Sequence, residues 1–398
     1  MTNNQVKAEI KGCFDFFWNE ANTDKSSDGF GLVRDKTAKG AENIASIASV
    51  GFGLSSIISG VERGFITKQE GQERVSGTLK TFMTNVEQAH GFFFHFLDMK
   101  TGKKYQQSYD CASIIDTSIF LNGALTTAEY FGGEIKELFE EIYSKVDWQK
   151  YYNKDENVYY MGYKPESGGF GAWDMYAEQL MQYILGVASP TFAVSPEVYN
   201  GFARDLGEYA GQLYYNSPGG ALFCHQFSHG YYDFKGVTDA DGINWFDNSV
   251  KATIAAREFS INNEKRFKTF HKNAWGVTAC EGSDGYRAYG VPPFHPNCND
   301  INDGTIPPCG ALGSIIFTPE IVLEALEFYN TVPNLIGKYG LKDSYNQDKD
   351  WICDFVIGID KGITAVMLEN FETGLIHELY MQNKYVKEAT TKLSWKKN

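Results

Sequence analysis

Two neighbouring stretches of the chain, "NIASIASVGFGLSSIISGVERG" at residues 43–64 and "TKQEGQERVSGTLKTFMTNV" at residues 67–86, decide the class of fold. Both have the periodicity of a helix, and the motif "ERG" closes the first one. In the second, Glu70 follows Thr67 by three residues, which is the pattern of a capping box. The two stretches therefore predict two successive helices with a short connection.

Helical periodicity recurs along most of the chain, between long loops rich in glycine, proline and asparagine. Such loops, when longer than about 15 residues, usually carry function or small strands. One of them, residues 91–105, is typical of a β-hairpin with its turn at residues 100–102. The further predicted helices lie near residues 4–20, 112–131, 134–147, 174–188, 196–213, 243–262, 319–330, 333–339, 359–371 and 373–387.

About a dozen helices of this kind indicate an all-α fold, a single (α/α)6 barrel spanning residues 1–398. In such a toroid of helical hairpins, the inner helices converge on a cleft that loops and small β-hairpins surround. A helical solenoid is the alternative, but the sequence shows no fixed period in its favour. No shift in composition marks a second domain.

The bulk composition restricts the partners of the chain. Its net charge of −14 argues against binding nucleic acid through a basic face. No apolar run reaches the roughly 20 residues that span a bilayer, so no membrane contact is expected. A neutral oligosaccharide or polysaccharide suits this charge. Aromatic residues make up 15% and could stack on sugars, although most must fill the core. We expect a monomer or a weak dimer.

The seven cysteines are scattered and form no CxxC pair, which suits a reducing compartment. Cys298 and Cys309 are the nearest two and could be bridged. The N-terminus lacks the pattern of a signal peptide, so the sequence as it stands predicts a cytoplasmic protein. A periplasmic or secreted protein is expected if a leader has been removed. The common nucleotide-binding and nucleophile motifs are missing, and no cofactor is expected.

Glu178 is the first candidate for chemistry. It lies beside an apolar stripe at helical spacing, in the stretch "GGFGAWDMYAEQLMQYILGVASPT" at residues 168–191. A carboxyl at the edge of such a stripe is partly desolvated, and this raises its pKa as a general acid requires. The alternative is a first-turn acid that complements the helix dipole. Taken alone, the spacing favours the alternative.

Two further acids, Asp116 and Asp360, lie at the starts of apolar helices. Asp116 follows Ser113 by three residues, which is again the pattern of a capping box. Asp360, in "GIDKG", is a good candidate for an N-cap. Asp110 and Glu369 lie near these two acids in the sequence. Each could be structural or could face a cleft.

His225, His229 and Asp233 are spaced by four residues in "HQFSHGYYDF". This spacing on a helix can bind zinc, but Gly230 and the preceding "NSPGG" argue against a helix. We therefore expect no metal site here. In contrast, the loop "WGVTACEGSDGYRAYGVPP" carries acids, an arginine and many rings, which favours contacts with carbohydrate. The residues in question are Trp275, Glu281, Asp284, Tyr286, Arg287 and Tyr289.

An ordered set of stretches resembles the glucoamylase-like glycoside hydrolases, a family that includes bacterial endo-β-1,2-glucanases and domains of cyclic β-1,2-glucan synthases. The stretches run from about residue 13 to residue 390. They include "FDFFWNEAN…GLVRDK", "GFFFHFLD", "IIDTSIFLNGAL", "AEQLMQYILGVASPT", "FCHQFSHGYYDF", "WGVTACEGSDGYRAYG", "GKYGLKDSYN" and "GIDKG…MLEN". The resemblance implies an (α/α)6 barrel and hydrolysis of a β-linked glucan with inversion, and β-1,2-glucan is the expected substrate.

The resemblance also assigns roles to residues. Glu178 matches the general acid, Asp360 is the leading candidate for the base, and Asp116 matches an acid expected to bind more than to react. The chain departs from the family at Ala177, where an asparagine is usual, and near Ser113, where another acid is usual; Asp110 could replace that acid. The residues expected to bind substrate are Asp110, Trp173, Tyr176, His225, Gln226, His229, Asp233, Glu281, Tyr286, Arg287, Tyr289 and Glu369. A sugar-binding protein without turnover and a transglycosylase are the alternatives.

Overall fold

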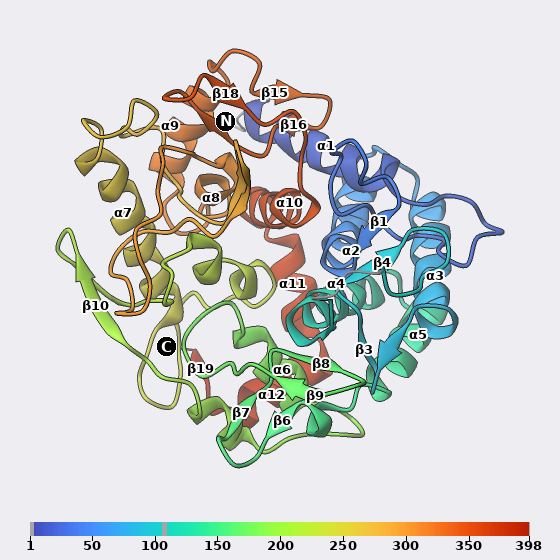
Figure 1. The fold of residues 1–398 in the computed structure, drawn as a ribbon. Coiled ribbons are helices and arrows are strands. Elements are labelled where there is room, and N and C mark those ends of the chain that lie inside the picture. The colour runs from blue at the N-terminus through green and yellow to red at the C-terminus, as the bar shows by residue number, and fades with distance from the viewer. Residues whose placement is uncertain (1–3, 106–109, 398) are drawn as a thin grey trace.

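Helices form most of the regular structure in the computed structural model, which describes residues 4–105 and 110–397 (Figure 1). Within these residues there are twelve α-helices: α1 (Asn4–Asn19), α2 (Ile47–Glu62), α3 (Lys68–Thr84), α4 (Ile114–Phe131), α5 (Gly133–Ser144), α6 (Leu180–Val187), α7 (Trp245–Asn262), α8 (Pro308–Leu312), α9 (Pro319–Tyr329), α10 (Gly358–Glu372), α11 (Leu375–Gln382) and α12 (Lys384–Lys392). Four short 3-10 helices are η1 (Trp148–Lys150), η2 (Pro196–Asn200), η3 (Leu222–His225) and η4 (Phe227–Gly230).

The strands are short and form small antiparallel sheets in the connections between helices. The one three-stranded sheet of the described residues joins β5 (Ala112–Ser113), β8 (Gly162–Lys164) and β9 (Gly168–Phe170). The two-stranded sheets pair β1 (Ile44–Ser46) with β4 (Phe96–Asp98), β2 (Gln88–Ala89) with β3 (Phe92–Phe93), β6 (Tyr152–Asn153) with β7 (Val158–Tyr159), β10 (Leu206–Tyr209) with β11 (Gln212–Tyr215), β12 (Val237–Thr238) with β19 (Lys396–Lys397), β13 (Cys280–Gly282) with β14 (Gly285–Arg287), β15 (Ile336–Gly337) with β16 (Gly340–Leu341), and β17 (Tyr345–Asn346) with β18 (Trp351–Ile352).

The helices differ in how much of their surface is buried. In α2, α4 and α10, most residues are buried. Most of the buried ones are apolar or small, but α10 also buries the charged side chains of Asp360, Lys361 and Glu369. In α3 and α5 only one face is buried, as expected for amphipathic helices. Helix α2 packs on α4 and α10, whereas α3 and α5 pack against each other and lie outside α2 and α4 (Figure 1). The helices therefore form an inner and an outer layer.

Close contact between α2 and α4 depends on two glycines. A Cβ atom at Gly123 would lie 2.0 Å from the carbonyl oxygen of Gly51. A Cβ atom at Gly51 would lie 2.5 Å from the carbonyl oxygen of Ile119. Since these atoms belong to the backbone, no side-chain movement could make room.

The inner helices α2, α4 and α10 begin at one end of the molecule. Strand β1 leads into α2 and β5 leads into α4, and a backbone ladder holds the two entrances together. His95 lies in this ladder: its N–H donates to the carbonyl of Cys111 at 2.9 Å, and its carbonyl accepts from the N–H of Ile47 at 3.2 Å. The segment at Asp35 joins this ladder to the start of α10, because the N–H of Gly358 donates to the Asp35 carbonyl at 2.7 Å.

Most helices expected from the sequence are confirmed, as are the capping box of Thr67 and Glu70 and the chain reversal at residues 98–103. The one helix expected at 373–387 is two, α11 and α12, because Asn383 is extended and caps α12. Three further expectations are wrong. The helix at 174–188 begins only at Leu180, because the backbone before it pairs with Ala203. The helix at 196–213 is instead η2 followed by the β10–β11 hairpin, whose turn has positive φ at Ala210 and Gly211. The helix at 333–339 is not formed, because Asn334 has positive φ in a turn and the β15–β16 hairpin follows it.

Three smaller observations complete the fold. Helix α8 lies within a segment for which only a loop is expected from the sequence. All seven cysteines, Cys298 and Cys309 included, are free thiols, so the bridge between these two is not formed. Among the described residues, none of the helices is both long enough and apolar enough to cross a membrane.

Candidate active site

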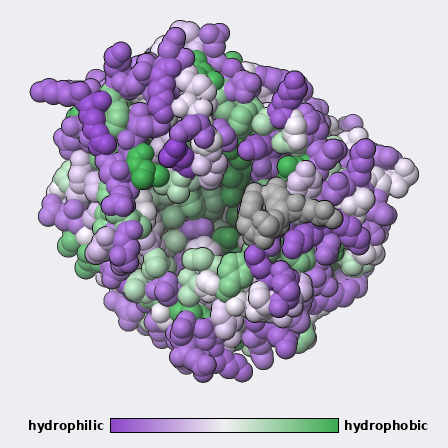
Figure 2. Space-filling view, in the orientation of Figure 1, coloured by the Kyte–Doolittle hydropathy of each residue, from purple (hydrophilic) through white to green (hydrophobic). Residues whose placement is uncertain are grey.

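A cavity of about 600 Å³ lies where α4 and α10 begin and where the chain turns into α6. Figure 2 shows this face of the molecule hollowed near its centre, with hydrophobic surface inside and mostly hydrophilic surface around it. The polar residues that line the cavity are Asp35, Lys36, His95, Asp116, Glu178, Tyr286 and Asp360, and the apolar ones are Ile44, Phe96, Ile115, Ile119, Phe223, Phe227, Ala279, Ile357 and Ile359. All three acids expected to be catalytic are therefore brought to one cavity.

Glu178 lies in the turn just before α6, and not in its first helical turn as the sequence suggests. The turn is fixed by Ser228, whose hydroxyl donates to the Glu178 carbonyl at 2.6 Å and accepts from the N–H of Met181 at 3.1 Å. The Cys224 thiol contacts Glu178 Oε2 at 3.5 Å. Burial raises the pKa of Glu178 to about 7, and the nearby Asp116 carboxylate adds to this effect. Near neutral pH, Glu178 can therefore hold a proton to donate.

Asp116 is the third residue of α4, and its neighbours hold both carboxyl oxygens. Ser113, the N-cap of α4, accepts from the N–H of Asp116 at 3.3 Å, and its hydroxyl also donates to Asp116 Oδ2. The other oxygen, Oδ1, lies 3.5 Å from His95 Nε2. The His95 ring in turn stacks on Phe96, with the ring centroids 3.9 Å apart. Asp116 is thus held firmly at the cavity wall.

Asp360 is likewise the third residue of its helix, α10, whose N-cap is Ile357. The expectation that Asp360 is itself the N-cap is therefore wrong. Its carboxyl is buried beside that of Asp343, which accepts from the N–H of Glu281 at 2.9 Å. Burial and the neighbouring carboxylate raise the pKa of Asp360 well above its usual range, while burial raises the pKa of Asp343 to about 6. The two carboxyls therefore titrate as a pair.

Four polar residues of this region were not singled out as candidates from the sequence: Asp35, Lys36, His95 and Asp343. They lie in loops or very short strands, where no periodic pattern marks a buried face. The only sequence signal for them is their position within the stretches "GLVRDK", "GFFFHFLD" and "GKYGLKDSYN", which carry the family resemblance.

Of the residues expected to bind substrate, Tyr286 on β14 lines the cavity and is 54% exposed. On the same hairpin, Glu281 Oε2 lies 3.5 Å from Lys36 Nζ, which places it next to the lining. Arg287 is paired with Asp284 on the outer side, and the hydroxyl of Tyr289 donates to Asp303 at 3.0 Å.

Asp110 is buried behind His95 and is not part of the cavity lining. Its Oδ1 atom accepts from the N–H of Cys111 at 2.9 Å and from that of Phe96 at 3.4 Å. Its other oxygen, Oδ2, has no hydrogen-bond partner among the described residues. Burial raises the pKa of Asp110 to about 6, and the His95 ring opposes this effect.

The remaining candidates are packed in the protein or lie on its surface, outside the lining. Trp173 and Tyr176 are buried, and the Tyr176 ring stacks on Trp245 at 4.6 Å. His225 is also buried, and burial lowers its pKa to about 3. In their present positions these rings have packing roles.

Four more have contacts that explain their positions without a substrate. Gln226 donates to the carbonyl of Gly310 at 2.7 Å, and the His229 ring is bonded to Ser249 at 3.0 Å. Glu369 is buried and accepts from Arg63 at 2.7 and 3.1 Å. Asp233 is near the surface, 3.8 Å from Lys397. No group of three or more histidine, cysteine, aspartate or glutamate side chains in the described part of the chain could hold a metal ion.

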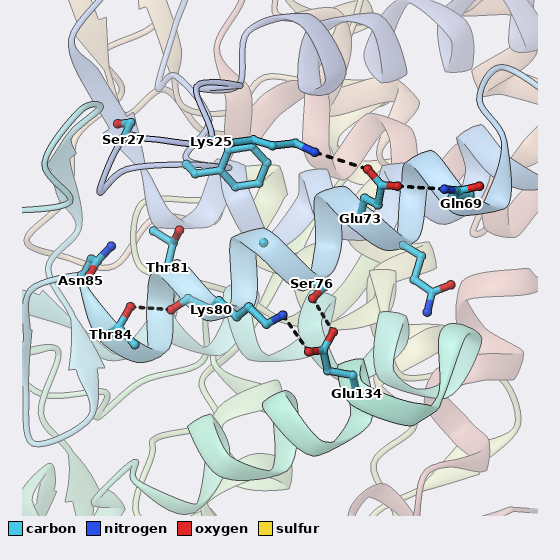
Figure 3. Close-up of a pocket in the computed structure, with 13 residues that line it drawn as sticks. Lys25, Ser27, Gln69, Glu73, Ser76, Lys80, Thr81, Thr84, Asn85 and Glu134 are labelled. Carbon is cyan, nitrogen blue, oxygen red and sulfur yellow. Dashed lines mark hydrogen bonds and ion pairs between the residues drawn. The ribbon is translucent and has the colours of Figure 1, made fainter.

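A second, more open groove of about 780 Å³ lies on the outer side of α3. Figure 3 shows that its charged side chains are bonded to each other: Lys25 with Glu73, and Lys80 with Glu134. Ser76 also donates to Glu134 at 2.7 Å. Because these charged groups are already paired with each other, they are less available to bind a ligand or transfer a proton than Glu178 and Asp360 are.

Comparisons with known proteins point to one family. The Glycoamylase family model, described as "Putative glucoamylase", matches residues 170–384. An exo β-1,2-glucooligosaccharide sophorohydrolase (non-reducing end) of Parabacteroides distasonis is 28% identical over 99% of the chain, and the chain spans 58% of that protein's length. The structure of an endo-β-1,2-glucanase from Chitinophaga pinensis, in complex with sophorotriose and glucose, has a TM-score of 0.88 at 27% identity and covers 98% of both chains. A β-1,2-glucanase structure from Parabacteroides distasonis has a TM-score of 0.88 at 26% identity, covering 99% of this chain and 60% of that one.

Proposed function

Because the chain belongs to the Glycoamylase family, we propose that it is a glycoside hydrolase acting on β-1,2-glucan or its oligosaccharides. One observation carries the proposal: Glu178, Asp116 and Asp360, from three separate segments, meet in one cavity. A pair of carboxyl groups in distinct surroundings is what acid and base hydrolysis of a glycosidic bond requires. Two relatives, the endo-glucanase and the sophorohydrolase, are named for action on β-1,2-linked glucose.

In the proposed reaction Glu178 donates its proton to the glycosidic oxygen as the bond from that oxygen to the anomeric carbon breaks. A water molecule adds to the anomeric carbon, and its proton passes to Asp360, directly or through a substrate hydroxyl. Asp360 must be ionised at that moment, so the pair of Asp343 and Asp360 carboxyls must first release the proton that Asp360 holds. Asp116 binds the sugar. As an inverting reaction, this requires carboxyl groups roughly 6.5–9.5 Å apart.

We also propose that the chain is one (α/α)6 barrel. Two features support this: the two layers of helices, and the inner helices α2, α4 and α10 that begin at the same end. The positive ends of these helices point towards the cavity, where they favour carboxylates. We further propose that the chain acts as a monomer or a weak dimer.

The proposal is tested by incubating the purified chain with linear β-1,2-, β-1,3- and β-1,4-glucans and separating the products. We expect new reducing ends from β-1,2-glucan at a rate at least about tenfold above the other linkages, a modest selectivity for a pocket built on hydroxyl contacts. Three results would contradict hydrolysis of this glucan. These are binding of sugar without new reducing ends, formation of longer or cyclic products, and faster cleavage of another linkage.

A further inference from the structure

Asp35 lines the cavity and is held there by its backbone alone. Its N–H donates to the carbonyl of Ile44 at 2.9 Å, and its carbonyl accepts from the N–H of Gly358 at 2.7 Å. Gly358 opens α10, two residues before Asp360. The side chain of Asp35 is not needed for this arrangement. It is therefore available for another task.

The Asp35 carboxyl is half-buried in the cavity, and none of the described residues forms a hydrogen bond with it. Partial burial of a polar group without a partner costs free energy, and such a group usually has a function or a missing partner. Neighbouring groups differ in this respect, since Asp116 is bonded to Ser113 and Glu178 to Cys224. Asp360 also has an oxygen without a partner, but its carboxyl lies beside that of Asp343, whereas among the described residues no carboxyl pair of this kind occupies Asp35.

Charged groups of both signs face Asp35 from every side. His95 and Asp116 lie towards α4, Lys36 follows in the chain, and Glu281 and Asp360 lie towards β13 and α10. Burial raises the pKa of Asp35, whereas His95 and Lys36 oppose the rise. A cationic ligand would be repelled by Lys36, and an anionic ligand would be repelled by Asp35, Asp116, Glu281 and Asp360. A neutral ligand with several hydroxyl groups suits this mixture best.

We propose that Asp35 is a substrate-binding residue that accepts hydrogen bonds from hydroxyl groups of the glucosyl unit in this cavity. The proposal rests on the proposed function, since it names a further contact in the same site. Asp35 binds the sugar and does not act as the base that takes a proton from water. It fixes the sugar between the walls that carry Asp116 and Asp360.

Binding is best measured without turnover. In a Glu178→Gln background, calorimetry with a linear β-1,2-glucooligosaccharide gives the dissociation constant directly. Adding Asp35→Ala should weaken binding about tenfold or more, because a hydrogen bond to an acid is lost. Asp35→Asn keeps one acceptor oxygen and should weaken binding less. The control is Asp15→Asn, which removes a carboxylate of α1 that pairs with Lys11 outside the cavity.

The outcomes separate the two proposals. If the Glu178→Gln protein binds the oligosaccharide and Asp35→Ala leaves the constant within about twofold, the role of Asp35 is refuted while the proposed function stands. If the Glu178→Gln protein binds no β-1,2-linked oligosaccharide, the proposed function itself fails. Equal losses in Asp35→Ala and Asp35→Asn would also contradict an acceptor role. Thermal unfolding of each variant shows whether the fold around the backbone hydrogen bonds of Asp35 is intact.

Discussion

Burial raises the pKa of both Glu178 and Asp360, but the carboxyl groups beside them act with different strength. For Glu178 burial is the main cause, with a smaller effect of Asp116. For Asp360 burial acts together with a second carboxyl, that of Asp343, at close range. Such divergent surroundings are how a fold assigns an acid and a base to two chemically similar groups. We propose Glu178 as the proton donor, because its pKa of about 7 lets it hold a proton near neutral pH.

The pH profile should report Glu178 directly. The donor must be protonated, so kcat/KM should fall as pH rises through about 7. Asp116→Asn removes a negative charge that raises the pKa of Glu178, and the falling limb should move to lower pH. Cys224→Val removes a thiol that stabilises the ionised form of Glu178, and the limb should move to higher pH. Initial rates from pH 5 to 9 measure both shifts.

Asp15→Asn serves as the control, since its carboxylate pairs with Lys11 on α1 and should leave the limb in place. Shifts of the same sign in Asp116→Asn and Cys224→Val would contradict the assignment of the limb to Glu178.

At the residue scale, the sequence could predict the three central acids but not their surroundings. Glu178 was expected at the edge of an apolar helix, and its partial burial agrees with that expectation. Its place in a turn was missed, because pairing of residues 174–176 with Ala203 overrides helical periodicity. Asp35 and His95 carry no local pattern, since loops far apart in the sequence bring them to the cavity.

At the scale of elements, the contact between α2 and α4 positions Asp116. Gly123→Ala would place a methyl group against the carbonyl oxygen of Gly51, and neither backbone can yield without moving a helix. We expect a loss of stability near or above the upper end of the roughly 1–3 kcal/mol typical of overpacked cores. Activity should fall as well, because α4 carries Asp116 at its start. Urea unfolding and initial rates measure the two effects.

Gly219→Ala is the matched control, because a Cβ atom there meets nothing within 4 Å. Stability of Gly123→Ala equal to that of Gly219→Ala would show that the helices can separate at no cost.

The hairpins that the sequence predicts as helices are mispredicted for a common physical reason. Long helices such as α4, α7 and α10 were expected at nearly their observed bounds, because many buried positions repeat with the helical period. The β10–β11 and β15–β16 hairpins were taken for helices. The β10–β11 turn has positive φ at Ala210 and Gly211, and positive φ at Asn334, just before β15, rules out a continuous helix there. The surrounding apolar residues give no signal for these backbone conformations.

At the scale of the whole molecule, the helices that stabilise the fold differ from the connections that complete the cavity. The inner helices supply a rigid frame, and their starts bring acids from distant parts of the chain to one place. The connections supply the rest of the cavity, with Asp35, His95 and Tyr286. This division explains why the helical class of the fold could be predicted from periodicity alone. Which residues line the cavity can be identified only from the folded chain.

We propose that Glu178 donates the proton that cleaves a β-1,2-glucosidic bond. The most direct measurement compares kcat of Glu178→Gln with that of the unchanged chain on a β-1,2-glucooligosaccharide, together with the affinity for that sugar. We expect Glu178→Gln to lower kcat by about a thousandfold or more, while the affinity for the oligosaccharide is retained. A kcat within about tenfold of the unchanged chain would contradict it.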